Sequence, residues 1–84
     1  MINDAVTCTA CPLFKGRTQV VLPSGDPNSK ILFIGEAPGV EEDATGKPFM
    51  GAAGVVLDRL LSRSGIRKDS VLITNLVMCR PPGN

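Results

Sequence analysis

The 84-residue sequence lacks an excess of basic charge and lacks any long apolar run. Nine basic residues against eight acidic ones leave a net charge of +1, so the chain has no bulk positive field of the kind that marks many DNA-binding domains. No run approaches the roughly 18 apolar residues that cross a membrane. Residues 1–7 hold neither the basic nor the apolar part of an export signal. These absences predict a cytoplasmic chain without a membrane partner, whose contacts with any nucleic acid would be local.

Cysteine is also scarce, and its count of three is odd. In a chain without an export signal, this count argues against a disulfide framework and favours ligation of a metal or cluster. Cys8 and Cys11 form a Cys-x2-Cys pair, and Cys79 lies far along the chain. A four-iron cluster takes four cysteines, and zinc held by four cysteines uses the same spacing. The spacing therefore leaves cluster, zinc and unligated cysteines open.

The first 29 residues show little periodic pattern. Proline and glycine interrupt them repeatedly, and only residues 18–22 suggest a short extended piece. We expect residues 1–29 to form an irregular arm that is held in place at Cys8 and Cys11.

Residues 30–84 indicate a strand, a loop, a helix and a second strand. The apolar runs at 31–34 and 71–73 are typical of parallel strands that are buried on both faces. The strand–helix–strand order predicts a right-handed βαβ unit, so the expected fold class is α/β with a parallel sheet. No internal repeat and no second domain is indicated.

A helix is predicted over residues 52–64, because apolar residues recur there at helical spacing. Gly65 followed by Ile66 predicts that the helix ends in a Schellman motif. The expected buried face consists of Ala53, Val56, Leu57, Leu60 and Leu61.

Polar residues follow both predicted strands. The carboxyl ends of parallel strands meet at one edge of a sheet, and in open α/β sheets ligands bind there. Glu36 and Asn75 should therefore converge on one crevice. An asparagine within an apolar segment costs stability unless its amide is satisfied, so Asn75 is either a cap for neighbouring backbone or a ligand group.

Three other features admit both a structural and a functional interpretation. The acidic residues Glu42 and Asp43 form either a solvated loop or helix cap, or part of a site. Phe49 is either a core aromatic or a surface on which a base stacks. The loop from Arg80 to Asn84 is either a connector or a contact for DNA phosphates.

The ordered set of motifs resembles the iron-sulfur uracil-DNA glycosylases, family 4 of the uracil-DNA glycosylase superfamily. The residues that carry the resemblance are Cys8-Thr9-Ala10-Cys11-Pro12-Leu13, Gly35-Glu36-Ala37-Pro38-Gly39, Glu42-Asp43, and the segments 46–51 and 74–84. The resemblance implies a three-layer α/β/α fold with a parallel central sheet, of which residues 1–84 would be the amino-terminal part of a single domain. It implies a monomeric enzyme of base excision repair that hydrolyses the N-glycosidic bond of uracil in single- or double-stranded DNA.

The resemblance also assigns roles to single residues. Ala37 stands where better-known relatives carry a catalytic Asp, so stabilising the sugar cation or orienting water falls to Glu36 or Glu42. The amide of Asn75 would select uracil over cytosine. The expected uracil-binding residues are Gly35, Glu36, Ala37, Phe49 and Asn75, and the DNA-backbone residues are Arg80, Pro81, Gly83 and Asn84. A 4Fe-4S cluster would be held by Cys8, Cys11, Cys79 and a fourth cysteine beyond Asn84, with zinc as the alternative.

The chain departs from this family in one respect: it has no histidine, and the family's second motif, a His followed by Pro and Ser, is missing. We therefore expect the 84-residue chain alone to be inactive or nearly so. Two alternatives stay open. One is a superfamily relative that acts on another damaged base or binds uracil-DNA covalently, and the other is a non-enzymatic iron-sulfur or zinc module.

Overall fold

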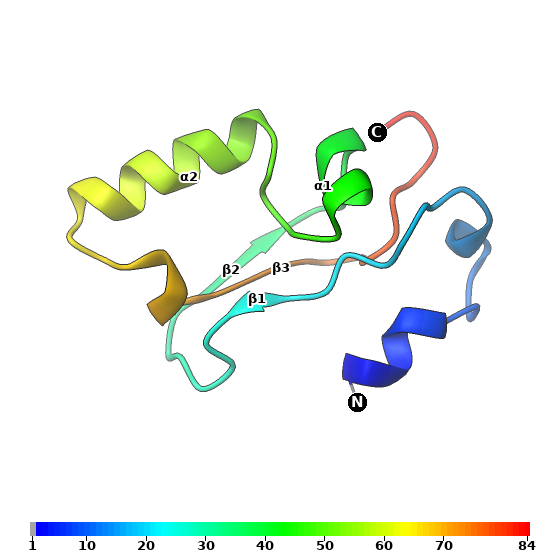
Figure 1. Cartoon of the computed structure of the whole chain (residues 1–84), viewed down its shortest axis with the longest axis horizontal. Coiled ribbons are helices and arrows are strands. Elements are labelled where there is room, and N and C mark those ends of the chain that lie inside the picture. The colour runs from blue at the N-terminus through cyan, green and yellow to red at the C-terminus, as the bar shows by residue number, and fades with distance from the viewer. Residues whose placement is uncertain (1) are drawn as a thin grey trace.

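Two parallel strands and the helix that joins them form the centre of the chain (Figure 1). The computed structural model describes residues 2–84, with side chains from Ala5 onward. Strand β2 (Leu32–Gly35) pairs with strand β3 (Leu72–Asn75), in a register that places Gly35 opposite Asn75. The two-residue strand β1 (Ser24–Gly25) pairs with β3 in the antiparallel direction. The predicted α/β class is confirmed, and the sheet is mixed, with strand order β1-β3-β2.

Helix α2 (Ala52–Arg63) packs on one face of this sheet. The core consists of Leu57 and Leu61 from the helix and Val71 and Ile73 from the β3 segment. These four apolar side chains leave water together, which is the main force that joins helix to sheet.

The helix ends as predicted, in a Schellman motif. The N–H of Gly65 donates to the carbonyl of Ser62 at 3.2 Å, and the N–H of Ile66 donates to that of Leu61 at 3.0 Å. Gly65 has a φ of 72°, and Ile66 packs against the core. The helix that the sequence predicts over 52–64 is therefore correct to within one residue.

The predicted buried face of α2 is partly wrong. Its buried positions are Gly54, Leu57 and Leu61, whereas Val56 and Leu60 are 57% and 58% exposed. Ala53 is exposed too, at the rim of a cavity described below. The sheet under the helix is only three short strands wide, so one stripe of the helix reaches it.

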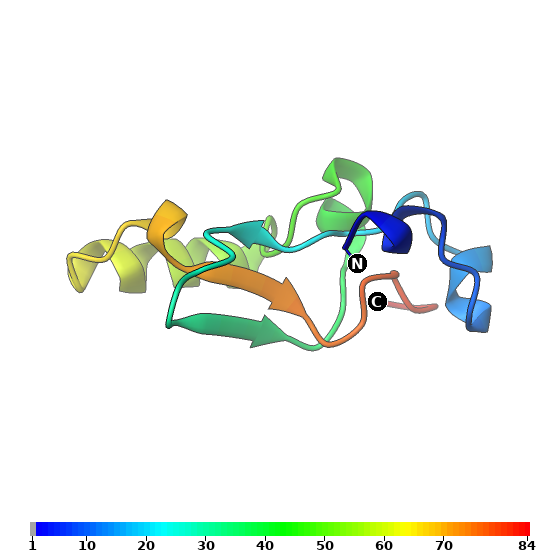
Figure 2. The same cartoon turned by 90° about the horizontal axis from the view of Figure 1, so that it is seen from below.

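The prediction that both strands are buried on both faces is also wrong. Leu32 and Ile34 of β2 are 49% and 59% exposed, and Ile31 before them is 44% exposed. Figure 2 looks onto the sheet from the side opposite α2, and no helix of residues 2–84 crosses this face. On β3, Ile73 is buried toward the helix while Leu72 is half-buried.

The remaining elements gather at the end of the sheet toward which β2 and β3 point (Figure 1). They are the 3-10 turns η1 (Ile2–Thr7) and η2 (Pro12–Lys15) of the amino-terminal arm, and the short helix α1 (Val40–Thr45). A third 3-10 turn, η3 (Lys68–Ser70), precedes β3 at the opposite end. Residues 18–22 form no strand, although Val20 and Val21 within them are buried. Within residues 2–84, no helix combines the length and the apolar character that crossing a membrane requires.

Candidate functional site

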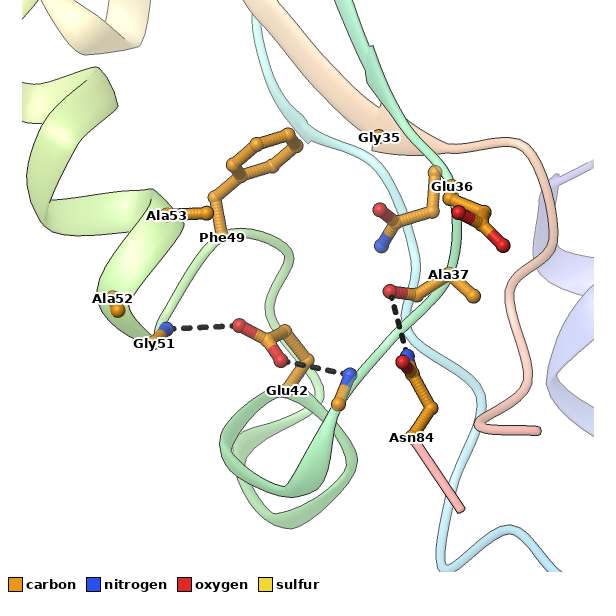
Figure 3. A pocket seen from close by; sticks show the side chains of 11 residues that line it. Gly35, Glu36, Ala37, Glu42, Phe49, Gly51, Ala52, Ala53 and Asn84 are labelled. Carbon is orange, nitrogen blue, oxygen red and sulfur yellow. Dashed lines mark hydrogen bonds between the residues drawn. The ribbon is translucent and has the colours of Figure 1, made fainter. Parts of the chain in front are cut away.

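A cavity of about 290 Å³ opens at the carboxyl ends of β2 and β3 (Figure 3). Glu36 follows β2, Asn75 ends β3, and Phe49 precedes α2, so the structure brings these three residues to one cavity as the sequence predicts. The cavity is lined by Gly35, Glu36, Ala37, Gly39, Glu42, Phe49, Gly51, Ala52, Ala53, Asn75 and Asn84.

Backbone pairing continues past the strands and holds the turn after β2. The N–H of Leu76 donates to the carbonyl of Gly35 at 2.7 Å, and the N–H of Val77 donates to that of Glu36 at 3.2 Å. These two bonds extend the parallel pairing of β2 and β3 and hold the backbone of Glu36 against the segment that follows β3.

Gly35 makes room for the two side chains that meet at this strand end. A Cβ atom there would overlap Oδ1 of Asn75 and would lie 2.9 Å from Cζ of Phe49. The absence of a side chain at residue 35 is thus what lets the amide and the ring share one cavity wall.

Asn75 is buried, with 7% of its surface exposed, and it lines the cavity. Its Nδ2 has no hydrogen-bond partner, and it is the one buried side-chain nitrogen or oxygen atom in that state among the described side chains. An unpaired buried donor costs about 1 to 3 kcal/mol, so a residue that served only as a cap would be expected to use it. The free donor favours the interpretation of Asn75 as a ligand group.

Phe49 serves both the core and the cavity. It is half-buried, packs against the core cluster and lines the cavity, where its ring points toward Gly35 (Figure 3). Its φ is 56°, and a positive φ is uncommon for an aromatic residue. Residues in such conformations cluster at functional sites. A Cβ atom on Gly54 would overlap the Phe49 carbonyl oxygen, so the glycine in α2 lets this backbone pass close to the helix.

Glu42 joins α1 to the start of α2 through three backbone N–H groups. One carboxylate oxygen accepts from Gly39 at 2.8 Å, and the other accepts from Met50 at 2.8 Å and Gly51 at 2.9 Å. The bond from Gly39, the residue before α1, is one half of a capping box, in which the N3 glutamate accepts from the N-cap backbone. The bond from Gly51 places this carboxylate at the amino terminus of α2, where the helix dipole favours an anion.

These contacts set the charge state of Glu42. Partial burial raises the pKa of its carboxyl, but the donors Gly39, Gly51 and Met50 outweigh that effect and hold the pKa below its ordinary value. Glu42 therefore lies at the cavity as an anchored anion.

Glu36 differs from Glu42 in its exposure and in its hydrogen bonds. Its side chain is exposed and, within the described part of the chain, accepts no hydrogen bond. It lies across the cavity from Glu42 (Figure 3). Of the two carboxylates that the sequence proposes for catalysis, Glu36 is the one that accepts no hydrogen bond from the described residues, whereas Glu42 accepts three.

The loop that the sequence assigns to the DNA backbone is divided between two places. Asn84 lines the cavity and donates its Nδ2 to the carbonyl of Pro38 at 2.8 Å. Arg80, Pro81 and Gly83 border a separate hollow of about 190 Å³. Nε of Arg80 donates to the carbonyl of Asn84 at 2.7 Å.

Asp43 attaches the amino-terminal arm to α1, a role that its place in an acidic run gave no reason to predict. It is 4% exposed, and its Oδ1 accepts from the N–H groups of Thr18 at 2.8 Å and Gln19 at 3.4 Å. Burial raises the pKa of its carboxyl, but the bonds from Thr18 and Gln19 and the charge of Arg80 outweigh this and lower it.

The three cysteines border one hollow of about 200 Å³, which is otherwise lined mainly by apolar residues. Cys8 and Cys11 are exposed and Cys79 is half-buried. Among the residues that the structure describes, no group of three Cys, His, Asp or Glu side chains is close enough together to hold a single metal ion. The thiols therefore surround a common space without meeting at one point. Soft thiolates around an apolar hollow fit an iron-sulfur cluster or zinc in their chemistry.

Comparison with known proteins agrees with this arrangement. The curated type-4 uracil-DNA glycosylase of Thermotoga maritima is 56% identical over 77 residues, which is 92% of this chain and 40% of that protein. Those of Saccharolobus solfataricus and Pyrobaculum aerophilum are 50% and 49% identical, over 100% and 92% of this chain and 40% and 39% of their own length. The chain thus spans about 40% of the length of these relatives. A model of the uracil DNA glycosylase superfamily matches residues 22–84, which include both strands, α2 and the whole cavity lining, and the chain belongs to that superfamily.

Proposed function

We propose that residues 1–84 supply the uracil-binding part of a DNA repair enzyme that hydrolyses the bond between uracil and deoxyribose, leaving an abasic site for base excision repair. Membership of the superfamily and the name shared by the three relatives support this activity. The observation that carries it is the buried, unpaired Nδ2 of Asn75 at the cavity. The substrate would be uracil in DNA, flipped out of the stack or already single-stranded.

An asparagine amide matches one edge of uracil. Nδ2 would donate to the O4 acceptor of uracil, and Oδ1 would accept from its N3–H. Cytosine presents a donor and an acceptor in the reverse order, so it would leave buried groups unpaired. In sites of this kind the penalty reaches roughly 10⁴-fold in kcat/KM. Backbone groups of Gly35, Glu36 and Ala37 would complete the contacts with uracil.

Phe49 would provide the stacking surface for the flipped base. Base stacking on an aromatic ring contributes about 1 to 3 kcal/mol. The contact with Gly54 and the bond from Met50 to Glu42 hold the backbone of Phe49, and packing against the core cluster holds its ring before any base arrives. A ring that is already placed loses little freedom on binding.

Glu36 is our candidate for the catalytic carboxylate. Breaking the N-glycosidic bond builds positive charge on the sugar, which a carboxylate stabilises directly or by orienting the attacking water. The three bonds that Glu42 accepts restrict its carboxylate to positioning the cavity loop. Arg80, Pro81, Gly83 and Asn84 would support the DNA backbone near the cavity.

The cysteine hollow would hold a 4Fe-4S cluster. Each thiolate of such a cluster binds a different iron, so thiols that surround a space without meeting at one point suit it. Cys8, Cys11 and Cys79 would be three of the ligands, with the fourth cysteine beyond Asn84. The cluster would supply no chemistry to the cavity and would hold the arm against the sheet. Zinc is the alternative, and absorption near about 400 nm together with metal analysis separates the two.

The placement of residues 1–84 in one domain, the cytoplasmic location and the monomeric state stay predictions. Residues 1–29 would form the cluster-binding arm of that domain, and residues 30–84 would form its strand, loop, helix and strand.

The test joins residues 1–84 to the part of the Thermotoga maritima relative that follows its matched segment. We expect this chimera to release uracil from a single-stranded oligonucleotide, and the 84-residue chain alone to release little or none. Asn75→Ala in the chimera should lower kcat/KM by about 10²- to 10³-fold, the loss typical of a removed active-site donor. Asn28→Ala, at an exposed position in the connection between β1 and β2, at the end of the sheet opposite the cavity, is the matched control and should leave the rate unchanged.

Two results would contradict the proposal. If Asn75→Ala changes only the thermal stability of the chimera and not uracil release, the amide is structural. If the chimera releases a different damaged base but not uracil, or forms a lasting covalent adduct with the oligonucleotide, another activity of the superfamily applies.

A further inference from the structure

Arg17 connects two of the cysteine-bearing segments through one guanidinium nitrogen. Its Nη1 donates to the backbone carbonyl of Cys8 at 2.6 Å, and the same atom contacts Sγ of Cys79 at 3.2 Å. Cys8 and Cys79 are 71 positions apart in the sequence, and both border the hollow. Arg17 is half-buried, so part of its charge is shielded from water beside a thiol.

We propose that Arg17 is a positioning residue of the cysteine hollow, which keeps Cys79 close to Cys8 and places a fixed positive charge beside the sulfur. This inference rests on the proposed iron-sulfur site and adds a residue that the ligand pattern does not contain. Arg17 does not ligate the cluster. It acts on the retention and the reduction potential of the cluster through Cys79.

The chemistry of a guanidinium suits this role. It stays charged at every physiological pH and offers five donors in a rigid plane, so one group serves a carbonyl and a sulfur together. Hydrogen bonds to the sulfurs and nearby charge are among the features that set the potential of an iron-sulfur cluster. A positive charge favours the more negative, reduced state, so Arg17 should raise the potential.

The part of the arm that follows Arg17 does not depend on the Arg17 side chain for its attachment. The next two residues, Thr18 and Gln19, donate their backbone N–H groups to Asp43. Further along, the N–H of Val21 donates to the carbonyl of Met78 at 2.8 Å. Removing the guanidinium should therefore leave residues 18–21 in place and change what the guanidinium touches, the carbonyl of Cys8 and the thiol of Cys79.

The experiment compares Arg17→Met and Arg17→Lys in the chimera with the unsubstituted chimera. Lys15→Met is the matched control, because Lys15 is exposed in the same arm and, within the described residues, makes no side-chain hydrogen bond. The measurements are iron per protein, the rate at which absorption near about 400 nm is lost in excess chelator, and the midpoint potential. Far-UV circular dichroism checks folding.

We expect Arg17→Met to lose iron several-fold faster than the unsubstituted chimera. The equilibrium between the oxidised and reduced cluster should shift about tenfold toward the oxidised state. For a one-electron couple this lowers the midpoint potential by about 59 mV. Arg17→Lys keeps the positive charge but loses the planar guanidinium. Its midpoint potential should therefore stay near that of the unsubstituted chimera, while its iron should be lost faster in chelator. Lys15→Met should match the unsubstituted chimera in both.

The outcomes separate this inference from the proposed function. If the unsubstituted chimera holds no iron, the cluster proposal itself fails. If it holds iron and Arg17→Met matches Lys15→Met in chelator resistance and potential, the role of Arg17 is overturned while the cluster stands. If Arg17→Met does not fold, Arg17→Lys decides, because iron loss at the unsubstituted rate would contradict the role and faster loss would support it.

Discussion

The cavity and the cysteine hollow lie at the same end of the molecule, but they are held together in different ways. The cavity is held by many hydrogen bonds within the chain. They include the bonds that the Glu42 carboxylate accepts from three backbone N–H groups and the pairing of Leu76 and Val77 with the end of β2. The hollow joins distant segments, and its thiols do not meet at one point. The chain therefore forms the cavity from its own hydrogen bonds, whereas the hollow, if it binds the proposed cluster, would need that ligand to bring its thiols together.

Among the effects that bear on this comparison, the largest expected one comes from a methyl group at the end of β2. Gly35→Ala would place a Cβ atom against the amide of Asn75 and the ring of Phe49, and displacing either group should lower uracil release by the chimera about 10²-fold. Gly16→Ala is the control, because a Cβ atom there meets nothing within 4 Å. Iron content should stay unchanged in both variants. A loss of iron in Gly35→Ala would show that cavity and hollow are not separate.

The second effect is on stability. Both carboxylate oxygens of Glu42 accept N–H groups, three in all, and Glu42→Gln would replace one oxygen by an NH₂ that cannot accept. We expect a loss of about 2 kcal/mol in the free energy of unfolding. Urea denaturation measures it, and Glu41→Gln, at an exposed neighbouring position in α1, is the control. Equal midpoints for the two variants would mean that the cavity loop does not depend on this carboxylate.

The third effect opposes helix propensity. Alanine is normally better than glycine inside a helix by about 1 kcal/mol, yet Gly54→Ala should destabilise the chain by about 1 to 3 kcal/mol, because the added Cβ would overlap the Phe49 carbonyl. Thermal unfolding followed by circular dichroism gives the sign. A raised melting temperature would contradict the close approach of the Phe49 backbone to α2.

The smallest effect is a dependence on pH. The pKa values of Glu42 and Asp43 are lowered in the folded chain from ordinary values of 4.5 and 3.8, so their stabilising contribution is complete above those values. This contribution is lost as the pH falls through the lower pKa values that the two carboxyl groups have in the folded chain. The urea midpoint should therefore decline below about pH 4.5 and decline less in Glu42→Gln. A midpoint that stays constant down to pH 3 would exclude both contributions.

The sequence predicted those parts of the fold that depend on local pattern. The parallel strands, the helix from Ala52 and its Schellman end follow from apolar runs and from Gly65 with Ile66. The convergence of Glu36 and Asn75 follows from parallel topology. These features depend on residues that are close in sequence or on one general rule of sheet geometry.

The remaining features depend on what covers each surface and on long-range polar contacts. The run at 31–34 could not show that Leu32 and Ile34 lie on the side of the sheet that no helix of the described residues covers. An acidic run gave no sign that Asp43 is buried against the arm while Glu42 binds three N–H groups. No sequence pattern pointed to Arg17, because its hydrogen-bond partners lie 9 and 62 residues away along the chain.

The central claim is that the unpaired amide of Asn75 receives uracil. The most direct measurement follows the side-chain ¹⁵N–¹H signals of Asn75 in the labelled chain while a uracil-containing trinucleotide is added, with the matching cytosine trinucleotide as the control. We predict that these signals shift with uracil and stay in place with cytosine. Signals that do not move at saturating uracil, or that move equally with cytosine, would contradict the claim.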